Sequence, residues 1–162
     1  MDTKKRNKMN ILITGINGFI GRNFYNDFIK NNFSNKFNFL IKNKNQKLKF
    51  KQKNVFFVVG DLTKKIYLPQ KKFDFVIHFA GLTAGKNVNN EYFSINELGT
   101  FNLLKNLKKK CKKFIFISTQ YVYGNPNSKK IKENSNLDPT FSNYSCSKIN
   151  SENWIKFFSN KF

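Results

Sequence analysis

The sequence predicts an α/β fold in which helices cover both faces of a doubly wound parallel sheet. Short apolar runs of strand length alternate along the chain with segments of helical periodicity. Several of these runs are apolar at every position, which is typical of strands covered by helices on each side. The runs end in glycine or small polar residues, as expected at the sheet edge where such folds bind ligands.

The first element is the apolar run 11–13, which is followed directly by Gly15, Gly18 and Gly21 and then by a segment, 22–30, that can continue as a helix. Glycines at these places let the chain turn off a strand, let a pyrophosphate approach the backbone, and let the helix pack against the strand. The helix N-terminus would then face the phosphates. Glycines alone also fit an ordinary turn, but their position after the first strand favours a dinucleotide site.

The remaining elements follow in the order expected for this fold class. Further strands are expected at 37–41, 55–59, 73–79 and 114–117, and helices within 91–110 and over 143–158. The polar run 42–53 is interpreted as a loop, and no internal repeat or linker is recognisable.

Composition limits the classes of partner. The chain has 162 residues, enough for one domain, and a formal net charge of +21. The lysines are spread along the chain and arginine occurs only at positions 6 and 22, whereas a nucleic-acid interface would concentrate cations and use arginine. We therefore interpret the charge as a solvated surface and expect no specific nucleic-acid binding.

Cysteine usage and the N-terminal residues indicate the compartment. Two cysteines and one histidine form neither a disulfide framework nor a zinc site, so we expect no metal and a reduced, cytoplasmic protein. Residues 1–8 are interpreted as a basic leader without the apolar core of a signal peptide, and 9–162 as the folded domain. No stretch approaches 18 apolar residues, so no membrane partner is expected.

One pair of residues indicates acid–base chemistry. Tyr144 and Lys148 are four residues apart and share one helix face, where the ammonium would lower the pKa of the phenol. A tyrosine activated in this way can serve as a general acid or base. Thr119, at the end of an expected strand, could hold the reacting oxygen of a substrate. The spacing alone also fits an accidental surface pair, but the glycine motif and the strand-end hydroxyls make accident less plausible.

With these motifs in this order, the chain resembles the extended short-chain dehydrogenase/reductases, the NAD-dependent epimerase/dehydratase family that modifies nucleotide sugars. The resemblance runs from Met9 to about Lys156. It is carried by the segments 14–21, 60–62, 78–82, 96–104, 118–124 and 144–148. It implies a Rossmann-like fold, NAD or NADP as cofactor, a nucleotide-sugar substrate, and hydride transfer between a sugar carbon and the nicotinamide ring.

The resemblance also implies roles for individual residues. Tyr144 would move the hydroxyl proton, Lys148 would hold the ribose and tune Tyr144, Thr119 would orient the substrate oxygen, and Asn96 would stabilise the site. The implied cofactor-binding residues are Gly15, Asn17, Gly18, Phe19, Ile20, Gly21, Asp61, Leu62, Phe79, Ala80, Gly81, Tyr144 and Lys148.

Three departures from the family pattern matter. The acid expected about 20 residues past the glycine turn is absent, and Lys42 and Lys44 stand near its place, which favours NADP over NAD. Gln120 and Tyr121 replace the Asp-Glu pair of the dehydratases, which favours epimerisation or keto-reduction over water elimination. The chain ends at Phe162, so we expect it to lack the C-terminal substrate lobe.

Three functions therefore remain, in the following order. The chain belongs to an epimerase or reductase, inactive as a fragment unless a homodimer or a second chain completes the substrate lobe. Alternatively, it is a non-catalytic NAD(P)-binding regulatory module. The third alternative is a basic nucleic-acid-binding protein.

Overall fold

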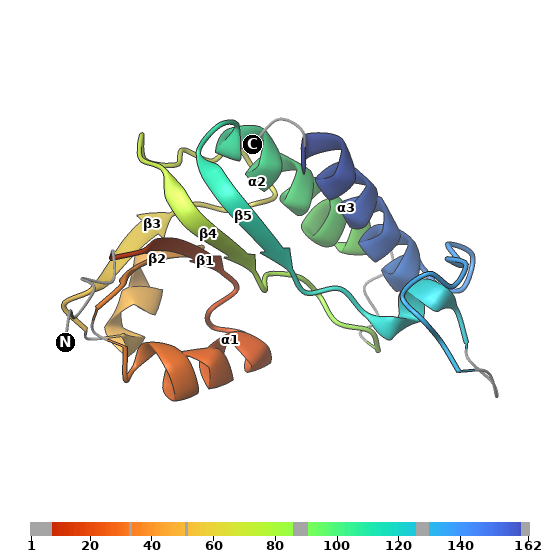
Figure 1. Ribbon diagram of the computed structural model, residues 1–162, viewed down its shortest axis with the longest axis horizontal. Helices are drawn as coiled ribbons and strands as arrows, with labels where there is room; N and C mark the ends of the chain where they lie inside the picture. Colours follow the sequence, from red (N-terminus) through yellow and green to blue (C-terminus); the bar gives the residue numbers. More distant parts are fainter. Residues whose placement is uncertain (1–7, 33, 51, 86–90, 126–129, 160–162) are drawn as a thin grey trace, which may run out of the picture. The chain divides into compact units, whose positions relative to one another are not determined.

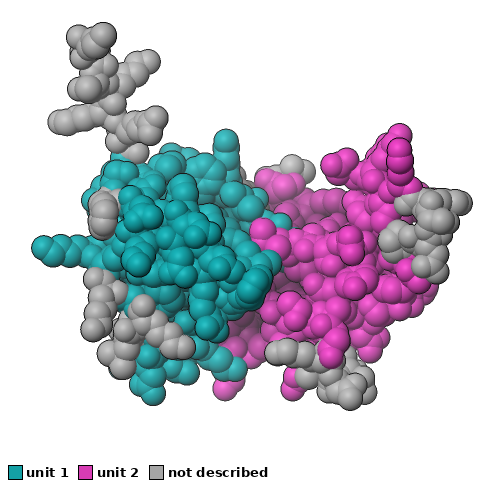
Figure 2. All heavy atoms as spheres, turned by 90° about the horizontal axis from the view of Figure 1, so that it is seen from below, with its two compact units in different colours: residues 1–60, 69–79, 109–116 teal, residues 61–68, 80–108, 117–162 magenta. Residues whose placement is uncertain are grey.

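The computed structural model describes residues 8–32, 34–50, 52–85, 91–125 and 130–159. They divide into two compact units, drawn in separate colours in Figure 2. Unit 1 comprises residues up to 60, 69–79 and 109–116, and unit 2 comprises 61–68, 80–108 and the residues from 117 onward. Of the expected basic leader, residues 1–7 lie outside the described residues.

Unit 1 contains a five-stranded sheet in which all neighbouring strands are parallel (Figure 1). Its strands are β1 (Asn10–Thr14), β2 (Lys36–Ile41), β3 (Val55–Val59), β4 (Phe73–His78) and β5 (Cys111–Phe116). Their spatial order is β3-β2-β1-β4-β5, so the chain runs outward from β1 to β3, crosses back, and continues with β4 and β5 on the other side of β1. This order is that of a doubly wound sheet and confirms the predicted fold class.

Two expectations about these elements need correction. β5 begins three residues before the expected start at 114, because Cys111 and Lys113 pair with residues of β4 through the backbone, which does not require apolar side chains. The run 42–53, expected to be a loop, contains a short 3₁₀ helix, η2 (Lys44–Lys49).

One buried cluster of unit 1 lies on a single face of the sheet. Alternate residues of β1, β2, β3 and β4 point to this face, as the two-residue period of a strand requires. The helix α1 (Phe19–Phe24) and the π-helical turn η1 (Tyr25–Ile29) belong to the same unit. The buried cluster consists of Ile11, Ile13, Ile16, Ile29, Phe37, Phe39, Ile41, Phe50, Val55 and Ile77.

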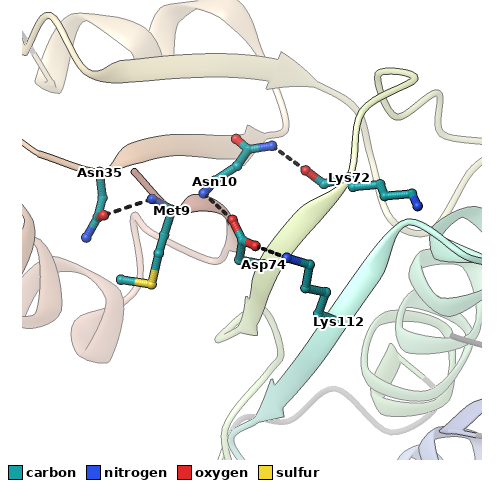
Figure 3. Close-up of polar contacts among 6 residues, drawn as sticks. All are labelled: Met9, Asn10, Asn35, Lys72, Asp74 and Lys112. Carbon is teal, nitrogen blue, oxygen red and sulfur yellow. Dashed lines mark hydrogen bonds and ion pairs between the residues drawn. The ribbon is translucent and has the colours of Figure 1, made fainter. Parts of the chain in front are cut away.

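A polar network fixes the beginning of β1, at the edge of the sheet opposite the glycine turn (Figure 3). The backbone N–H of Asn10 donates to the Asp74 carboxylate at 2.8 Å, and Lys112 Nζ contacts the same carboxylate at 2.7 Å. The Asn10 side chain donates to the Lys72 carbonyl at 2.6 Å. The hydrogen bond from Lys112, more than any other contact, lowers the pKa of Asp74. β1, β4 and β5 are thereby joined at their amino ends.

Unit 2 is helical. Its elements are η3 (Phe93–Leu98, a π-helical turn), α2 (Gly99–Leu107), the 3₁₀ turn η4 (Gln120–Tyr123) and α3 (Asn143–Ser159). Both expected helices are therefore confirmed. α3 begins where Ser142 accepts hydrogen bonds from the N–H groups of Ser145, through its hydroxyl, and Cys146, through its carbonyl. Within the described residues no helix is long and apolar enough to cross a bilayer.

Serines let α3 pack closely on η3. Ser147 and Ser151 are fully buried, one helical turn apart. The Ser147 hydroxyl accepts from Asn96 Nδ2 at 3.2 Å, and the Ser151 hydroxyl donates to the Asn96 carbonyl at 3.1 Å. The small side chains therefore satisfy polar groups that would otherwise be buried without partners between the helices.

Candidate functional site

The glycine turn of unit 1 joins β1 to α1. Gly15 has φ +72°, in the left-handed region that favours glycine, and its carbonyl accepts from the Gly18 N–H at 3.0 Å. A Cβ at Gly21 would come within 2.4 Å of the Gly15 carbonyl oxygen and 2.6 Å of Ile16 Cα. Only glycine at position 21 therefore allows the helix to lie this close to the turn.

The start of α1 is chemically open. Gly18 caps the helix without a side-chain hydrogen bond, and among the described residues no acid occupies the first turn. The side chains that begin the helix are strongly exposed, 85% for Phe19 and 49% for Ile20. Backbone N–H groups at a helix start beside glycines fit an anionic phosphate, and the exposed apolar side chains fit a ligand that covers them.

Two further residues shape this loop. The Asn17 carbonyl accepts from Arg22 Nε at 2.8 Å, while its buried side-chain oxygen Oδ1 has no hydrogen-bond partner among the described residues. The Phe79 N–H donates to the Thr14 carbonyl at 3.1 Å, and its ring lies 5.3 Å from the Phe24 ring. Unit 1 thus brings Phe79 and the glycine turn to the carboxyl ends of β4 and β1.

In unit 2, the turn at Asp61 and Leu62 is held by local hydrogen bonds. The Asp61 carboxylate accepts from the Thr63 N–H at 3.0 Å and from its hydroxyl at 2.8 Å. The Leu62 carbonyl accepts from Asn102 Nδ2 at 2.8 Å, which anchors the turn to α2. These contacts fix the backbone of a turn that the sequence assigned to the cofactor.

Asn96 connects a second loop of the site to the helices. Its side chain is 2% exposed, accepts from the Leu82 N–H at 2.7 Å and donates to the Leu82 carbonyl at 3.2 Å. A Cβ at Gly81 would lie 3.0 Å from Asn96 Oδ1, so the loop that contains Ala80 and Gly81 runs closely past the amide. The amide of Asn96 is thus fully engaged by hydrogen bonds within the protein.

The Thr119 side chain acts on the Tyr144 phenol as a hydrogen-bond partner and lowers its pKa. Thr119 Oγ1 also accepts from the Tyr121 N–H at 3.3 Å, at the beginning of η4. The Tyr144 ring lies 5.5 Å from the ring of Tyr92 and 6.3 Å from that of Tyr121. A threonine and a tyrosine expected from sequence to act on one oxygen are therefore in contact.

Lys148 lies one turn further along α3 and is only 5% exposed. Its Nζ donates to the Ile117 carbonyl at 2.6 Å. Burial lowers the pKa of this ammonium to about 8, although the charge of Glu152 acts in the opposite direction. Lys148 is thus a buried cation held next to the segment that carries Thr119.

The expected effect of Lys148 on the Tyr144 pKa was wrong. The pKa of Tyr144 is raised, chiefly because burial disfavours the phenolate, and the neighbouring Tyr92 and Tyr121 raise it further. The hydrogen bond with Thr119 partly offsets this rise. Sequence spacing reports how close the two groups are, but not how deeply the phenol is buried.

The two units hold different parts of the predicted set. Unit 1 contains Gly15, Asn17, Gly18, Phe19, Ile20, Gly21 and Phe79, and unit 2 contains Asp61, Leu62, Ala80, Gly81, Asn96, Thr119, Tyr144 and Lys148. Within unit 2 the four expected catalytic residues are connected through α3, because Ser147 binds Asn96 and the segment 117–119 binds Lys148 and Tyr144.

Sequence reasoning missed three residues that contact this group. Tyr92 and Tyr121 pack against Tyr144, and Glu152 accepts a hydrogen bond from the Ser118 hydroxyl. Glu152 lies four residues after Lys148, a spacing that could have indicated it. No sequence signal identifies Tyr92.

The strand order and the glycine turn after β1 define a Rossmann-like dinucleotide-binding class of fold. Within that class, the chain belongs to the NAD dependent epimerase/dehydratase family, which it matches over residues 11–162. The resemblance inferred from the motifs is thereby confirmed.

Relatives in this family are sugar-nucleotide epimerases. The chain is 39% identical to a UDP-glucose 4-epimerase of Pisum sativum over 133 residues, covering 72% of this chain and 38% of that enzyme. It is 34% identical to a putative UDP-glucose 4-epimerase of Methanocaldococcus jannaschii, covering 91% of this chain and 50% of the relative. The chain therefore spans half or less of the length of these curated relatives.

Solved structures agree in fold. The UDP-glucuronic acid 4-epimerase of Bacillus cereus, solved in complex with NAD, has a TM-score of 0.75 and 26% identity, covering 95% of this chain and 53% of that chain. A UDP-galactose 4-epimerase has a TM-score of 0.79 at 23% identity, with 95% and 52% covered, and this likeness supports the fold alone.

Proposed function

We propose that this chain is the NAD(P)-binding part of a nucleotide-sugar epimerase or reductase. The observation that carries the proposal is the placement of the buried Lys148 ammonium, which donates to the Ile117 carbonyl two residues before Thr119 and lies one helical turn from Tyr144. Family membership and the epimerase relatives support the substrate class. The residues 9–162 would act as one dinucleotide-binding domain.

The proposed cofactor-binding residues are those predicted from the sequence. The N–H groups near Gly18 and the start of α1 would bind the diphosphate, with Phe19 and Ile20 covered by the ligand. The other contacts would come from Gly15, Asn17, Gly21, Asp61, Leu62, Phe79, Ala80, Gly81, Tyr144 and Lys148. The absence of a side-chain cap or first-turn acid among the described residues of α1 supports this assignment.

When bound, the dinucleotide supplies a nicotinamide that accepts and returns a hydride. Tyr144 would exchange a proton with the sugar hydroxyl, and its raised pKa keeps it protonated near neutral pH, as a proton donor must be. Thr119 would orient the same oxygen, and Lys148 would hold the ribose. Asn96 would keep the loop at Leu82 aligned with α3.

Epimerisation or keto-reduction is proposed over water elimination. Gln120 and Tyr121 carry no carboxylate beside Thr119 to remove a water molecule. The Tyr121 ring stacks on Phe141 at 5.8 Å and meets the Tyr144 ring edge-on. Packed aromatic rings therefore lie where the dehydratases have the second carboxylate of the pair.

The proposed cofactor preference is for NADP over NAD. β2 ends at Ile41, and Lys42 and Lys44 follow it with exposed side chains that suit a 2′-phosphate. The solved Bacillus cereus relative binds NAD, so the ratio of the dissociation constants for NADPH and NADH tests this preference. Replacing both lysines with aspartate should reverse the ratio.

The complete protein is proposed to be cytoplasmic and to use a substrate lobe supplied by further residues, by a second copy in a homodimer, or by a second chain. Free thiols at Cys111 and Cys146 support a reduced compartment.

The proposal is tested by titrating the purified protein with NADPH and NADH and, in a form that includes the substrate lobe, by assaying interconversion of UDP-glucose and UDP-galactose. Tyr144→Phe should abolish turnover and leave dinucleotide binding unchanged. Tyr67→Phe is the matched control, because Tyr67 is 74% exposed. Equal turnover by wild type and Tyr144→Phe would contradict the catalytic role.

The same measurements separate the other functions. Dinucleotide binding that raises the melting temperature, without turnover of any nucleotide sugar, would favour the regulatory module. An affinity for nucleic acid that falls steeply with salt would favour the nucleic-acid binder.

A further inference from the structure

Three consecutive residues of unit 2 are bonded to three turns of α3. Ile117 accepts from Lys148, Ser118 donates to Glu152, and Thr119 shares a hydrogen bond with Tyr144. Tyr144, Lys148 and Glu152 are spaced at four-residue intervals and therefore lie on one face of the helix. Glu152 is the member of this set to which the proposed mechanism gives no role.

We propose that Glu152 is a positioning residue that sustains the charge of Lys148 and holds Thr119 against Tyr144. The inference deepens the proposed function and rests on it, since it concerns the same acid–base group. Glu152 would touch neither cofactor nor substrate. It would act through Ser118, with which it is hydrogen-bonded, and through Lys148, one turn away on α3.

The charge argument starts from the burial of Lys148. An ammonium that is 5% exposed loses most of its hydration, and an uncompensated buried charge is costly. Glu152 lies one turn away, and its carboxylate opposes the lowering of the Lys148 pKa. Because Glu152 is only partly exposed, solvent screens this attraction incompletely.

Other titratable groups of the elements packed around α3 cannot supply this charge near neutral pH. Glu152 is the carboxylate whose charge acts on Lys148, whereas the carboxylate of Glu97 on η3 accepts from Asn150 Nδ2 at 2.8 Å. The titratable groups of these elements are Tyr144, Cys146, Glu152 and Lys156 on α3, Glu91 and Tyr92 before η3, Glu97 on η3, Lys105 on α2, and Tyr121 and Tyr123 on η4.

The geometric argument concerns the segment 117–119. The bond from Ser118 to Glu152 fixes the residue directly before Thr119. The bond from Lys148 fixes the residue before that. With both anchored to α3, the Thr119 hydroxyl has little freedom to leave Tyr144.

The experiment measures the pKa of Lys148 by competitive labelling with trace acetic anhydride between pH 6 and 11, followed by peptide mass spectrometry. No cofactor is needed. Wild type should titrate near pH 8. Glu152→Gln should shift Lys148 downward by about one pH unit. Ser118→Ala, which keeps the carboxylate, should leave the titration within a few tenths of a unit of wild type, and Glu97→Gln is the matched control.

A second measurement follows NADPH affinity as a function of pH. The loss of affinity at high pH should occur at a lower pH in Glu152→Gln, by the same amount as the shift in the Lys148 pKa. An unshifted Lys148 titration in Glu152→Gln, or a wild-type Lys148 that titrates near 10.5, would overturn the inference. If Glu152→Gln does not fold, the inference is tested by the Lys148 pKa of wild type and of Glu152→Asp, in which Lys148 should titrate close to its wild-type pKa. A shifted Lys148 in a protein that binds no dinucleotide would count against the proposed function alone.

Discussion

Lys148 Nζ and the Ile117 carbonyl oxygen are 2.6 Å apart. This contact places a lysine cation inside unit 2 and ties the middle of α3 to the segment that carries Thr119. Burial disfavours the charge of this cation, and titratable groups in such environments are common at functional sites.

The burial of Lys148 predicts a specific dependence of stability on pH. Its pKa is lowered from 10.5 to about 8, so between these values the folded protein binds fewer protons than the unfolded chain, and stability due to Lys148 rises with pH. Lys148→Met lacks this contribution. Between pH 7 and pH 10, the free energy of unfolding of wild type, measured in urea and compared with that of the variant, should therefore rise by roughly 3 kcal/mol at most. Lys156→Met, in the last turn of α3, is the control, and a constant difference across pH would refute the prediction.

Gly21→Ala should destabilise the protein more than Gly18→Ala. The new methyl group would meet backbone atoms at 2.4 and 2.6 Å, whereas at Gly18 the nearest atom is 3.3 Å away. We expect a loss of about 1–3 kcal/mol for Gly21→Ala by denaturant unfolding. Gly18→Ala should instead weaken NADPH binding with little loss of stability. Equal stability of the two variants would show that the turn can relax.

Asn96→Ala should destabilise unit 2 because it removes both partners of Leu82. The loss should be about 1–3 kcal/mol, the cost of leaving buried polar groups without hydrogen bonds. Asn96→Asp should be no better, because a second acceptor would face the Leu82 carbonyl. Asn106→Ala is a matched control, since its amide donates to the Asn102 carbonyl on the same helix. Thermal unfolding of the three variants tests this order.

Asp74 should contribute stability that is lost in acid. Its pKa is lowered below the ordinary 3.8, so the contribution is present above that value and disappears as pH falls through the folded pKa. Because its partner Lys112 is 70% exposed, the effect should be about 0.5–1 kcal/mol. Asp74→Asn should show a flatter acid limb between pH 5 and pH 2 than wild type. Asp27→Asn, on η1, should retain the wild-type slope.

Much of the fold was predictable because its signals are local. Neighbouring residues alone predict the strands β2 and β3, from their apolar runs, and the turn after β1, from the glycines at 15, 18 and 21. β5 was placed too late because its first residues include lysines, and only pairing with β4 shows that they are strand.

The sequence by itself determined the fold class and the family, and it predicted Thr119, Tyr144 and Lys148 as catalytic residues, because spacing and residue type can be read without coordinates. Only the tertiary structure decided that burial raises the Tyr144 pKa and lowers that of Lys148. It also brought Glu152 to Ser118 across 34 residues and Asn96 to Ser147 across 51. Burial and contacts between distant segments depend on how the helices pack. The spacing of residues along the chain does not show which side chains lose contact with water when that packing forms.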